Sequence, residues 1–222
     1  MHKFVILAQG QSNNVELQKE RWVGFDIIFS TWKGCERLYS NGDVVVFNEK
    51  PSDSGPANIN YQKISTISGL QLAKEMGYTH LLKIRDDIVP SNSINFFKLL
   101  DLDKLNFLAW HRHEVYPNCP GYLVDFLMGG PIDSMIDLWN IQSNFCNVPE
   151  IILTWNYIQK CNKIGINYLL NGINSDTNEL HWVKNGINIS NYKALEINDE
   201  RGNFIYTDSI EFLNNNYIDF LK

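Results

Sequence analysis

The chain has 222 residues, of which 44% are hydrophobic and 20% charged, and its formal net charge is -6. This composition is typical of a globular chain with a sizeable core and argues against intrinsic disorder. The negative charge leaves no basic footprint, so we do not expect a nucleic acid polymer as a partner. An anionic ligand would have to be bound by a cation, by a few Arg or Lys side chains, or by backbone N–H groups at its site.

The N-terminal residues predict a strand rather than a targeting segment. The apolar run Phe4–Ala8 is too short for a secretion signal, and no stretch of the chain approaches the ~18–20 apolar residues that a membrane span needs. The four cysteines are widely spaced and form no Cys-x-x-Cys pair, so neither a zinc site nor a disulfide framework is indicated. We therefore expect a cytoplasmic protein.

The first half of the chain alternates strand-like and helix-like segments. Short apolar runs predict four strands, at 4–8, 25–32, 43–47 and 79–84. Apolar residues at helical spacing predict a weak helix within 11–24 and a strong one from Asn58 to Met76, which Gly77 is placed to end. This alternation predicts an α/β fold, with a mostly parallel sheet flanked by helices.

The second half is less regular. A strand is predicted at Leu105–Trp110 and an apolar run at Leu123–Met128. We expect the following Gly129-Gly130-Pro131 to form a tight turn with free N–H groups that opens a helix, and a further helix is predicted over Pro149–Lys163. Because neither a repeat nor a linker is evident, we treat 1–222 as a single domain.

Polar residues follow three of the predicted parallel strands, namely Gln9-Gly10, Ser30-Thr31-Trp32 and Arg85-Asp86-Asp87. Ligands in such sheets bind beyond the carboxyl ends of the strands. We therefore expect these three segments to lie side by side at one edge of the sheet.

Arg85-Asp86-Asp87 is the sharpest feature of the sequence. Two adjacent carboxylates at the end of a buried strand concentrate negative charge where desolvation is costly. A divalent cation can neutralise them, and hard oxygen ligands suit Mg²⁺ or Mn²⁺, which can in turn bind a diphosphate. Lys83 and Arg85 would offset phosphate charge if their side chains share the ligand face. The structural alternative is that Asp86 caps a turn and Asp87 pairs with a surface Lys.

Two neighbouring segments carry a resemblance to a known family. Residues 58–70, with Ser65 and Gly69-Leu70, and the Lys-x-Arg-x-Asp pattern at 83–87 resemble the WavE-type lipopolysaccharide-synthesis glycosyltransferases. The resemblance covers roughly residues 3–160. It implies a GT-A-like (Rossmann-like) fold, a nucleotide-sugar donor and a divalent metal held mainly by Asp87, with Asp86 less secure.

Within this single domain, we expect residues 1–90 or so to bind the nucleotide and residues 91–222 or so to form the acceptor side. The residues expected to bind the nucleotide sugar are Gln9, Gly10, Ser30, Thr31, Trp32, Asn60, Gln62, Lys83, Arg85 and Asp86. Each has a structural alternative: a first turn for Gln9-Gly10, core packing for Thr31 and Trp32, and a solvated helix face for Asn60 and Gln62. An aromatic side chain at a strand end can instead stack on a nucleobase.

Three further residues are candidates for the chemical step. Asp125 is a single carboxylate in an apolar run, which is costly unless it is used or hydrogen-bonded. Asp125 or Glu150 is expected to be the general base that deprotonates the acceptor, although Glu150 could equally serve the dipole of its own helix. His181 is a weaker candidate for completing the metal shell, because a lone His near an aromatic residue is usually structural.

The residues and the resemblance together predict transfer of a sugar from a nucleotide-diphosphate-sugar donor to a hydroxyl of a glycan or glycolipid acceptor, with Mn²⁺ or Mg²⁺. The resemblance also implies that the transfer inverts the configuration of the sugar. A lipid-linked acceptor would bring the protein to a membrane surface, so peripheral association stays open. One alternative is a sugar-nucleotide nucleotidyltransferase, although residues 9–14 lack the Gly-rich basic loop that it usually needs. The other is a catalytically silent glycan-binding module.

Overall fold

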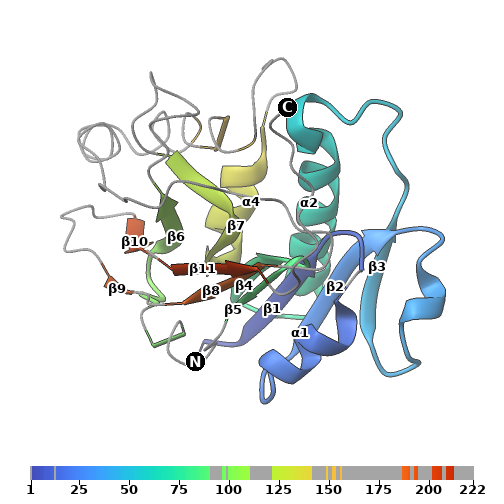
Figure 1. The fold of residues 1–222 in the computed structure, drawn as a ribbon, viewed down its shortest axis with the longest axis horizontal. Helices are drawn as coiled ribbons and strands as arrows, with labels where there is room; N and C mark the ends of the chain where they lie inside the picture. The colour runs from blue at the N-terminus through green and yellow to red at the C-terminus, as the bar shows by residue number, and fades with distance from the viewer. Residues whose placement is uncertain are drawn as a thin grey trace.

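A computed structural model describes residues 2–12, 14–90, 97–98, 100–110, 122–141, 149, 152–153, 156, 187–190, 193–194, 202–206 and 209–212. Within these residues the main sheet has eight strands in the order β3-β2-β1-β4-β7-β6-β10-β9 (Figure 1). Its strands are β1 (Phe4–Gln9), β2 (Ile27–Trp32), β3 (Val44–Asn48), β4 (His80–Arg85), β6 (Leu105–Trp110), β7 (Tyr122–Pro131), β9 (Lys193–Ala194) and β10 (Gly202–Tyr206). A smaller sheet joins β11 (Ser209–Phe212), β8 (Ile187–Ser190) and β5 (Ile88–Pro90).

The four strands predicted in the first half form a parallel set. Gln9 on β1 is aligned with Ser30 on β2 and with Arg85 on β4, so the carboxyl ends of these strands reach one edge of the sheet. Beyond β4, β7 runs antiparallel to both β4 and β6, and β10 is parallel to β6. The structure thus confirms the expected mostly parallel α/β sheet flanked by helices.

Two helices pack against each other on one face of the sheet. Helix α2 (Ile59–Glu75) contacts β1, β2 and β3, and it also contacts α4 (Ile132–Trp139), as Figure 1 shows. Gly69 allows the close approach of α2 to β1, because a Cβ at that position would lie 2.3 Å from a methyl of Leu7. Leu7 and Leu70 are fully buried in the core between the helix and the sheet.

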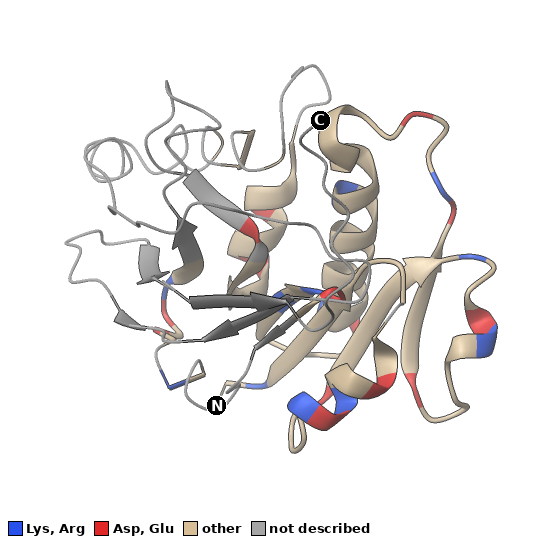
Figure 2. Cartoon of the chain, in the orientation of Figure 1, with Lys and Arg blue, Asp and Glu red and all other residues tan. Residues whose placement is uncertain are grey.

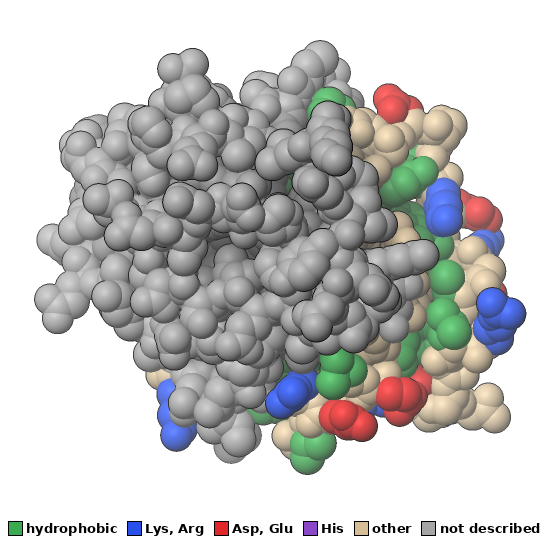
Figure 3. Space-filling model, in the orientation of Figure 1, with side chains coloured by type: hydrophobic (Ala, Val, Ile, Leu, Met, Phe, Trp, Pro, Cys, Tyr) green, Lys and Arg blue, Asp and Glu red, His purple; other side chains and the backbone are tan. Residues whose placement is uncertain are grey.

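Short helical elements cover other parts of the first half: α1 (Val15–Arg21) and two 3₁₀ turns, η1 (Glu36–Leu38) and η2 (Pro56–Asn58). Figure 2 shows acidic and basic residues interspersed over α1 and η1 rather than gathered by sign. In Figure 3 hydrophobic side chains on this face lie among polar and charged ones. None of the helices within the described residues is long and apolar enough to cross a membrane.

The expectation that Gly129-Gly130-Pro131 opens a helix is confirmed, because α4 follows Pro131, but the expected tight turn was wrong. These residues form the end of strand β7, where Gly129 pairs with Leu82 and Gly130 with Leu81, and α4 begins only after Pro131. A Cβ at Gly129 would lie 2.6 Å from the carbonyl oxygen of Leu81. The glycines therefore serve close strand approach rather than a turn, because they carry no side chain.

We predict that Gly129→Ala lowers the free energy of unfolding by about 1–3 kcal/mol, because the added methyl meets backbone rather than a flexible side chain. Urea denaturation measures this change. Gly42→Ala is the matched control, since a Cβ there meets nothing within 4 Å. Equal stability of the two variants would contradict the close packing of β7 on β4.

Candidate functional site

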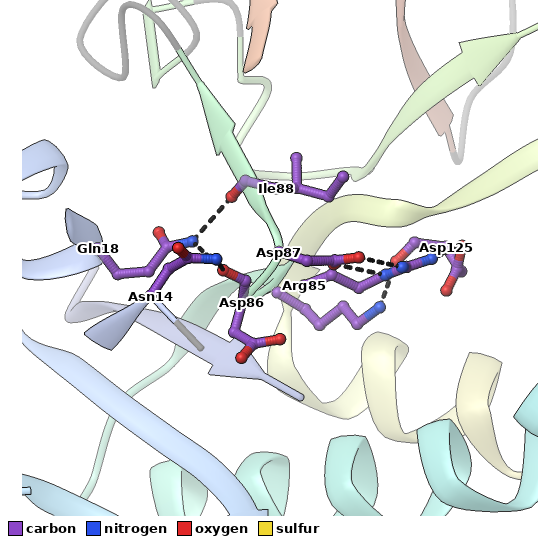
Figure 4. Close-up of polar contacts among 8 residues, drawn as sticks. Asn14, Gln18, Arg85, Asp86, Asp87, Ile88 and Asp125 are labelled. Carbon is purple, nitrogen blue, oxygen red and sulfur yellow. Dashed lines mark hydrogen bonds and ion pairs between the residues drawn. The ribbon is translucent and has the colours of Figure 1, made fainter. Parts of the chain in front are cut away.

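Asp86 and Asp87 form the turn between β4 of the main sheet and β5 of the smaller sheet. The backbone of this turn is held from two sides. The Asp86 N–H donates to the Gln9 carbonyl at 2.9 Å, and the side-chain amides of Asn14 and Gln18 each donate to the Asp86 carbonyl at 3.1 Å (Figure 4). Gln18 also donates to the carbonyl of Ile88 at 2.8 Å. Helix α1 and the end of β1 therefore fix the turn that carries both carboxylates.

The two adjacent carboxylates point away from each other (Figure 4). The buried Asp86 carboxylate lies over Gly10, where an added Cβ would come within 1.8 Å of Oδ1. Gly10 has φ +153°, so both its backbone and the space above it require glycine. Asp87 faces the other way, toward Arg85. In this structure the pair does not converge on one point, as an ion shared by both carboxylates would require.

Arg85 lies between Asp87 and Asp125. Its Nε donates to Asp87 Oδ1 at 2.9 Å, and its Nη2 binds the second oxygen of the same carboxylate. Its remaining nitrogen, Nη1, lies 3.7 Å from Asp125 Oδ1. Such a two-armed contact fits the planar fork of an Arg side chain. Arg85, expected as a phosphate partner, is thus already engaged by two carboxylates.

Asp125 is fully buried, and within the described residues neither of its carboxylate oxygens has a hydrogen-bond partner. It stands at an irregularity of β7. Met128 lies opposite Phe107, whereas Val124 lies opposite the next residue, Leu108, so that 125–127 are extra residues on β7. Bulges of this kind re-aim side chains and are common beside active sites. The bulge thus brings a buried carboxylate to Arg85.

Lys83 supports the same bulge from β4. Its side chain is fully buried, its amine donates to the backbone carbonyl of Asp125, and the amine lies 5.0 Å from the ring centre of Trp139. A bulge leaves backbone groups unpaired, and a buried carbonyl needs a donor. Lys83 was expected beside a phosphate, but its side chain lies inside the protein and satisfies this carbonyl.

The other strand ends form a buried polar network against α2. The side-chain amide of Gln9 donates to the Ser65 hydroxyl at 2.8 Å, whereas the side-chain oxygen Oε1 of Gln9 has no hydrogen-bond partner within the described residues. The Ser30 hydroxyl donates to the Ser65 carbonyl at 2.6 Å. Trp32 is 3% exposed and packs against Tyr61 with ring centres 5.2 Å apart. The strand-end residues therefore lie together, as expected, but Trp32 is covered by protein.

Three residues of this edge were missed by sequence reasoning. Asn48, at the end of β3, donates to the Ser30 hydroxyl at 3.0 Å and to the Thr31 carbonyl at 2.8 Å. Ser12 donates to the Thr31 hydroxyl at 2.6 Å and also bonds the phenol of Tyr39. Burial raises the pKa of Tyr39 to about 12, so this phenol stays protonated at neutral pH. Asn48 could have been found by extending the strand-end argument to the third strand.

The remaining expected site residues are Asn60, Gln62, Glu150 and His181. Asn60 donates to the carbonyl of Asp53 at 3.1 Å, and the side-chain oxygen of Gln62 is buried with no partner within the described residues. Glu150 and His181 lie outside the described residues, as does most of the helix predicted over 149–163.

The donor set suits a divalent cation that is held only partly by protein. Asp87 offers a carboxylate that is 20% exposed at the ligand edge, and hard cations such as Mg²⁺ are commonly bound by one or two carboxylates together with ligand phosphates. Within the described residues no group of three His, Cys, Asp or Glu side chains could enclose an ion. The residues thus fit a metal shared with a phosphate ligand, with Asp87 as the main protein donor.

Comparison by sequence found neither a matching family model nor a matching curated protein. Among solved structures, the chain is similar to a mannose-1-phosphate geranyltransferase from Thermus thermophilus, with 10% identity over 95% of this chain and 76% of that one, at a TM-score of 0.48. It is also similar to a protein assigned as a nucleotide-diphospho-sugar transferase from Desulfovibrio desulfuricans, with 11% identity over 72% and 75% of the two chains and a TM-score of 0.46.

A third similar structure is an active-site mutant of LgtC, with 14% identity over 78% of this chain and 79% of that one, at a TM-score of 0.45. The WavE-type family itself is not among these matches, so that more specific resemblance stays a prediction.

We predict that Lys83→Met lowers the free energy of unfolding by about 2 kcal/mol, because the buried carbonyl of Asp125 loses its donor. Hydrogen exchange should also become faster at the amides of β7 around residue 125. Lys74→Met is the control, since Lys74 is exposed and its carboxylate partner Asp133 lies at the surface. Unchanged exchange in β7 would show that Lys83 does not hold the bulge.

Proposed function

We propose that this protein is a glycosyltransferase that moves a sugar from a nucleotide-diphosphate-sugar donor to a hydroxyl of a glycan or glycolipid acceptor. The reaction is metal-dependent, with Mn²⁺ or Mg²⁺, and inverts the configuration of the transferred sugar. The resemblance of residues 58–87 to the WavE-type family supports the choice of donor class.

The observation that carries this proposal is the arrangement of charge at the carboxyl edge of the sheet. Asp87 and Arg85 lie at the end of β4, and the β7 bulge brings Asp125 to the other side of the same guanidinium. The partly exposed carboxylate of Asp87 thus lies where it could bind a cation on a diphosphate, in competition with Arg85. A second lies in a buried position, where a carboxylate can act as a base.

In the proposed reaction, the acceptor oxygen attacks the anomeric carbon of the donor as the bond from that carbon to the diphosphate oxygen breaks. Asp125 or Glu150 takes the proton of the acceptor hydroxyl, and the nucleoside diphosphate leaves with the electron pair of the broken bond. Asp87 would hold the divalent cation, which when bound neutralises the diphosphate as a leaving group. Gln9, Gly10 and Asp86 lie together at the ends of β1 and β4 and would bind the nucleotide of the donor.

The two alternatives differ from this proposal in what they need. A sugar-nucleotide nucleotidyltransferase must hold a triphosphate, but the residues that follow β1, from Gly10 to Asn14, include neither Lys nor Arg. A glycan-binding module would need no cation and would release no nucleoside diphosphate. Release of pyrophosphate from a nucleoside triphosphate and sugar phosphate would identify the first, and glycan binding without turnover the second.

We predict that Asp87→Asn lowers Mn²⁺-dependent release of nucleoside diphosphate from a panel of nucleotide sugars by about a hundredfold or more, because the cation loses its main protein ligand. Asp133→Asn is the matched control, since this carboxylate is 78% exposed on α4. Wild-type turnover in the Asp87 variant, or turnover unaffected by chelation of divalent cations, would refute the assignment.

Asp125→Asn is expected to lower kcat for transfer to an acceptor by about a hundredfold, because a general base contributes a factor of this order. The affinity for the donor nucleotide, measured by calorimetry at saturating Mn²⁺, should change far less than kcat. If kcat is retained, the base is elsewhere, and Glu150→Gln is then the variant to measure.

A further inference from the structure

We propose that the guanidinium of Arg85 exchanges between two carboxylates. It pairs with Asp87 when no divalent cation is bound, and it pairs with Asp125 when a cation binds Asp87. This inference rests on the proposed function, because it concerns the cation of the same site. It assigns Arg85 a positioning role in place of a simple contact with phosphate.

The first step of the argument is that Arg85 and a metal compete for the same atoms. Both oxygens of the Asp87 carboxylate accept from Arg85, one from Nε and one from Nη2. A Mg²⁺ or Mn²⁺ ion needs at least one of these oxygens in its coordination shell. The pair is only 14% and 20% exposed at the Arg85 and Asp87 side chains, so water screens it less than a surface pair. Metal binding at Asp87 must therefore break part of this contact.

The second step is that a destination for the guanidinium already exists. Nη1 lies 3.7 Å from Asp125 Oδ1, which is close enough for an ion pair but too long for a hydrogen bond. Asp125 is fully buried, and within the described residues both its oxygens lack a hydrogen-bond partner. A buried carboxylate without a hydrogen-bond partner is stabilised by any donor that moves closer to it. A small shift of Arg85 toward β7 would provide one.

The third step is that the two carboxylates become coupled through Arg85. The loss of the Arg85–Asp87 contact is offset by a closer contact between Arg85 and Asp125. Binding of a cation to Asp87 and pairing of Arg85 with Asp125 therefore stabilise each other. The coupling is a difference in free energy between two arrangements of one side chain, and linkage makes it reciprocal. The cation position and the buried carboxylate thus act together rather than independently.

The experiment measures Mn²⁺ affinity without any nucleotide sugar, by electron paramagnetic resonance of free Mn²⁺, for wild type and for Arg85→Gln, Asp125→Asn and the double variant. Asp87→Asn identifies ions bound elsewhere. Arg85→Gln should bind Mn²⁺ about tenfold more tightly than wild type, within the usual range of coupling between linked sites, because the competing guanidinium is gone. Lys74→Gln, which removes an equal charge from an exposed pair, should leave the affinity unchanged.

The double variant separates exchange from general electrostatics. If Asp125 acts through Arg85, then Asp125→Asn weakens Mn²⁺ binding several-fold in wild type but has less than about a twofold effect when Arg85 is already Gln. If the Asp125 charge acts on the ion directly, Asp125→Asn weakens binding equally in both backgrounds. The double variant also removes both buried charges together, so it provides a folded comparison if Arg85→Gln alone is unstable.

Additive effects of the two substitutions, weaker Mn²⁺ binding by Arg85→Gln, or no Asp87-dependent binding in any variant would each overturn the exchange. The proposed function is judged separately by transfer activity. Metal-dependent transfer that is lost in Asp87→Asn, together with an additive cycle, would leave the glycosyltransferase assignment standing and the exchange refuted.

Discussion

The arrangement of the site depends on the need of one buried carboxylate for positive charge. Asp125 is completely shielded from solvent and accepts no hydrogen bond within the described residues, so an isolated charge there would be costly. Two basic side chains of β4 contact Asp125 in different ways. Arg85 approaches its carboxylate, whereas Lys83 donates to its backbone carbonyl. The alternation of side chains along a strand places these two basic residues on one side of β4, two positions apart.

The turn after β4 separates the two adjacent Asp residues. Asp87 follows Arg85 by two positions and lies with it, whereas Asp86 lies on the other side, above Gly10. The acidic pair thus belongs to two neighbouring environments. Asp86 borders the polar network that connects β1, β2 and α2, and Asp87 borders the charged cluster of β4 and β7. The proposed nucleotide-sugar donor, if it spans the carboxyl edge, would contact both.

Much of the first half of the fold could be predicted from the sequence, because short apolar runs bounded by polar residues and alternating with helix-like segments are typical of strands in such a sheet. The convergence of Gln9, Ser30 and Arg85 followed from the parallel arrangement alone. Gly129-Gly130 was misread because glycine permits both a turn and a close strand approach, and only the partner strand decides between them. The β7 bulge and the burial of Lys83 depend on pairing between distant segments, which no local pattern reveals. The divergence of Asp86 and Asp87 likewise depends on the turn between β4 and β5, which the sequence analysis did not predict.

The turn that carries these carboxylates has a mechanical consequence. It is the direct covalent link between β4 of the main sheet and β5 of the smaller one, and Gln18 ties its two ends to α1 by donating to the carbonyls of both Asp86 and Ile88. A rotation of the smaller sheet relative to the main one would therefore also displace this turn and the Asp87 carboxylate. Gln18 would be the fixed point of this displacement, because it binds both ends of the turn.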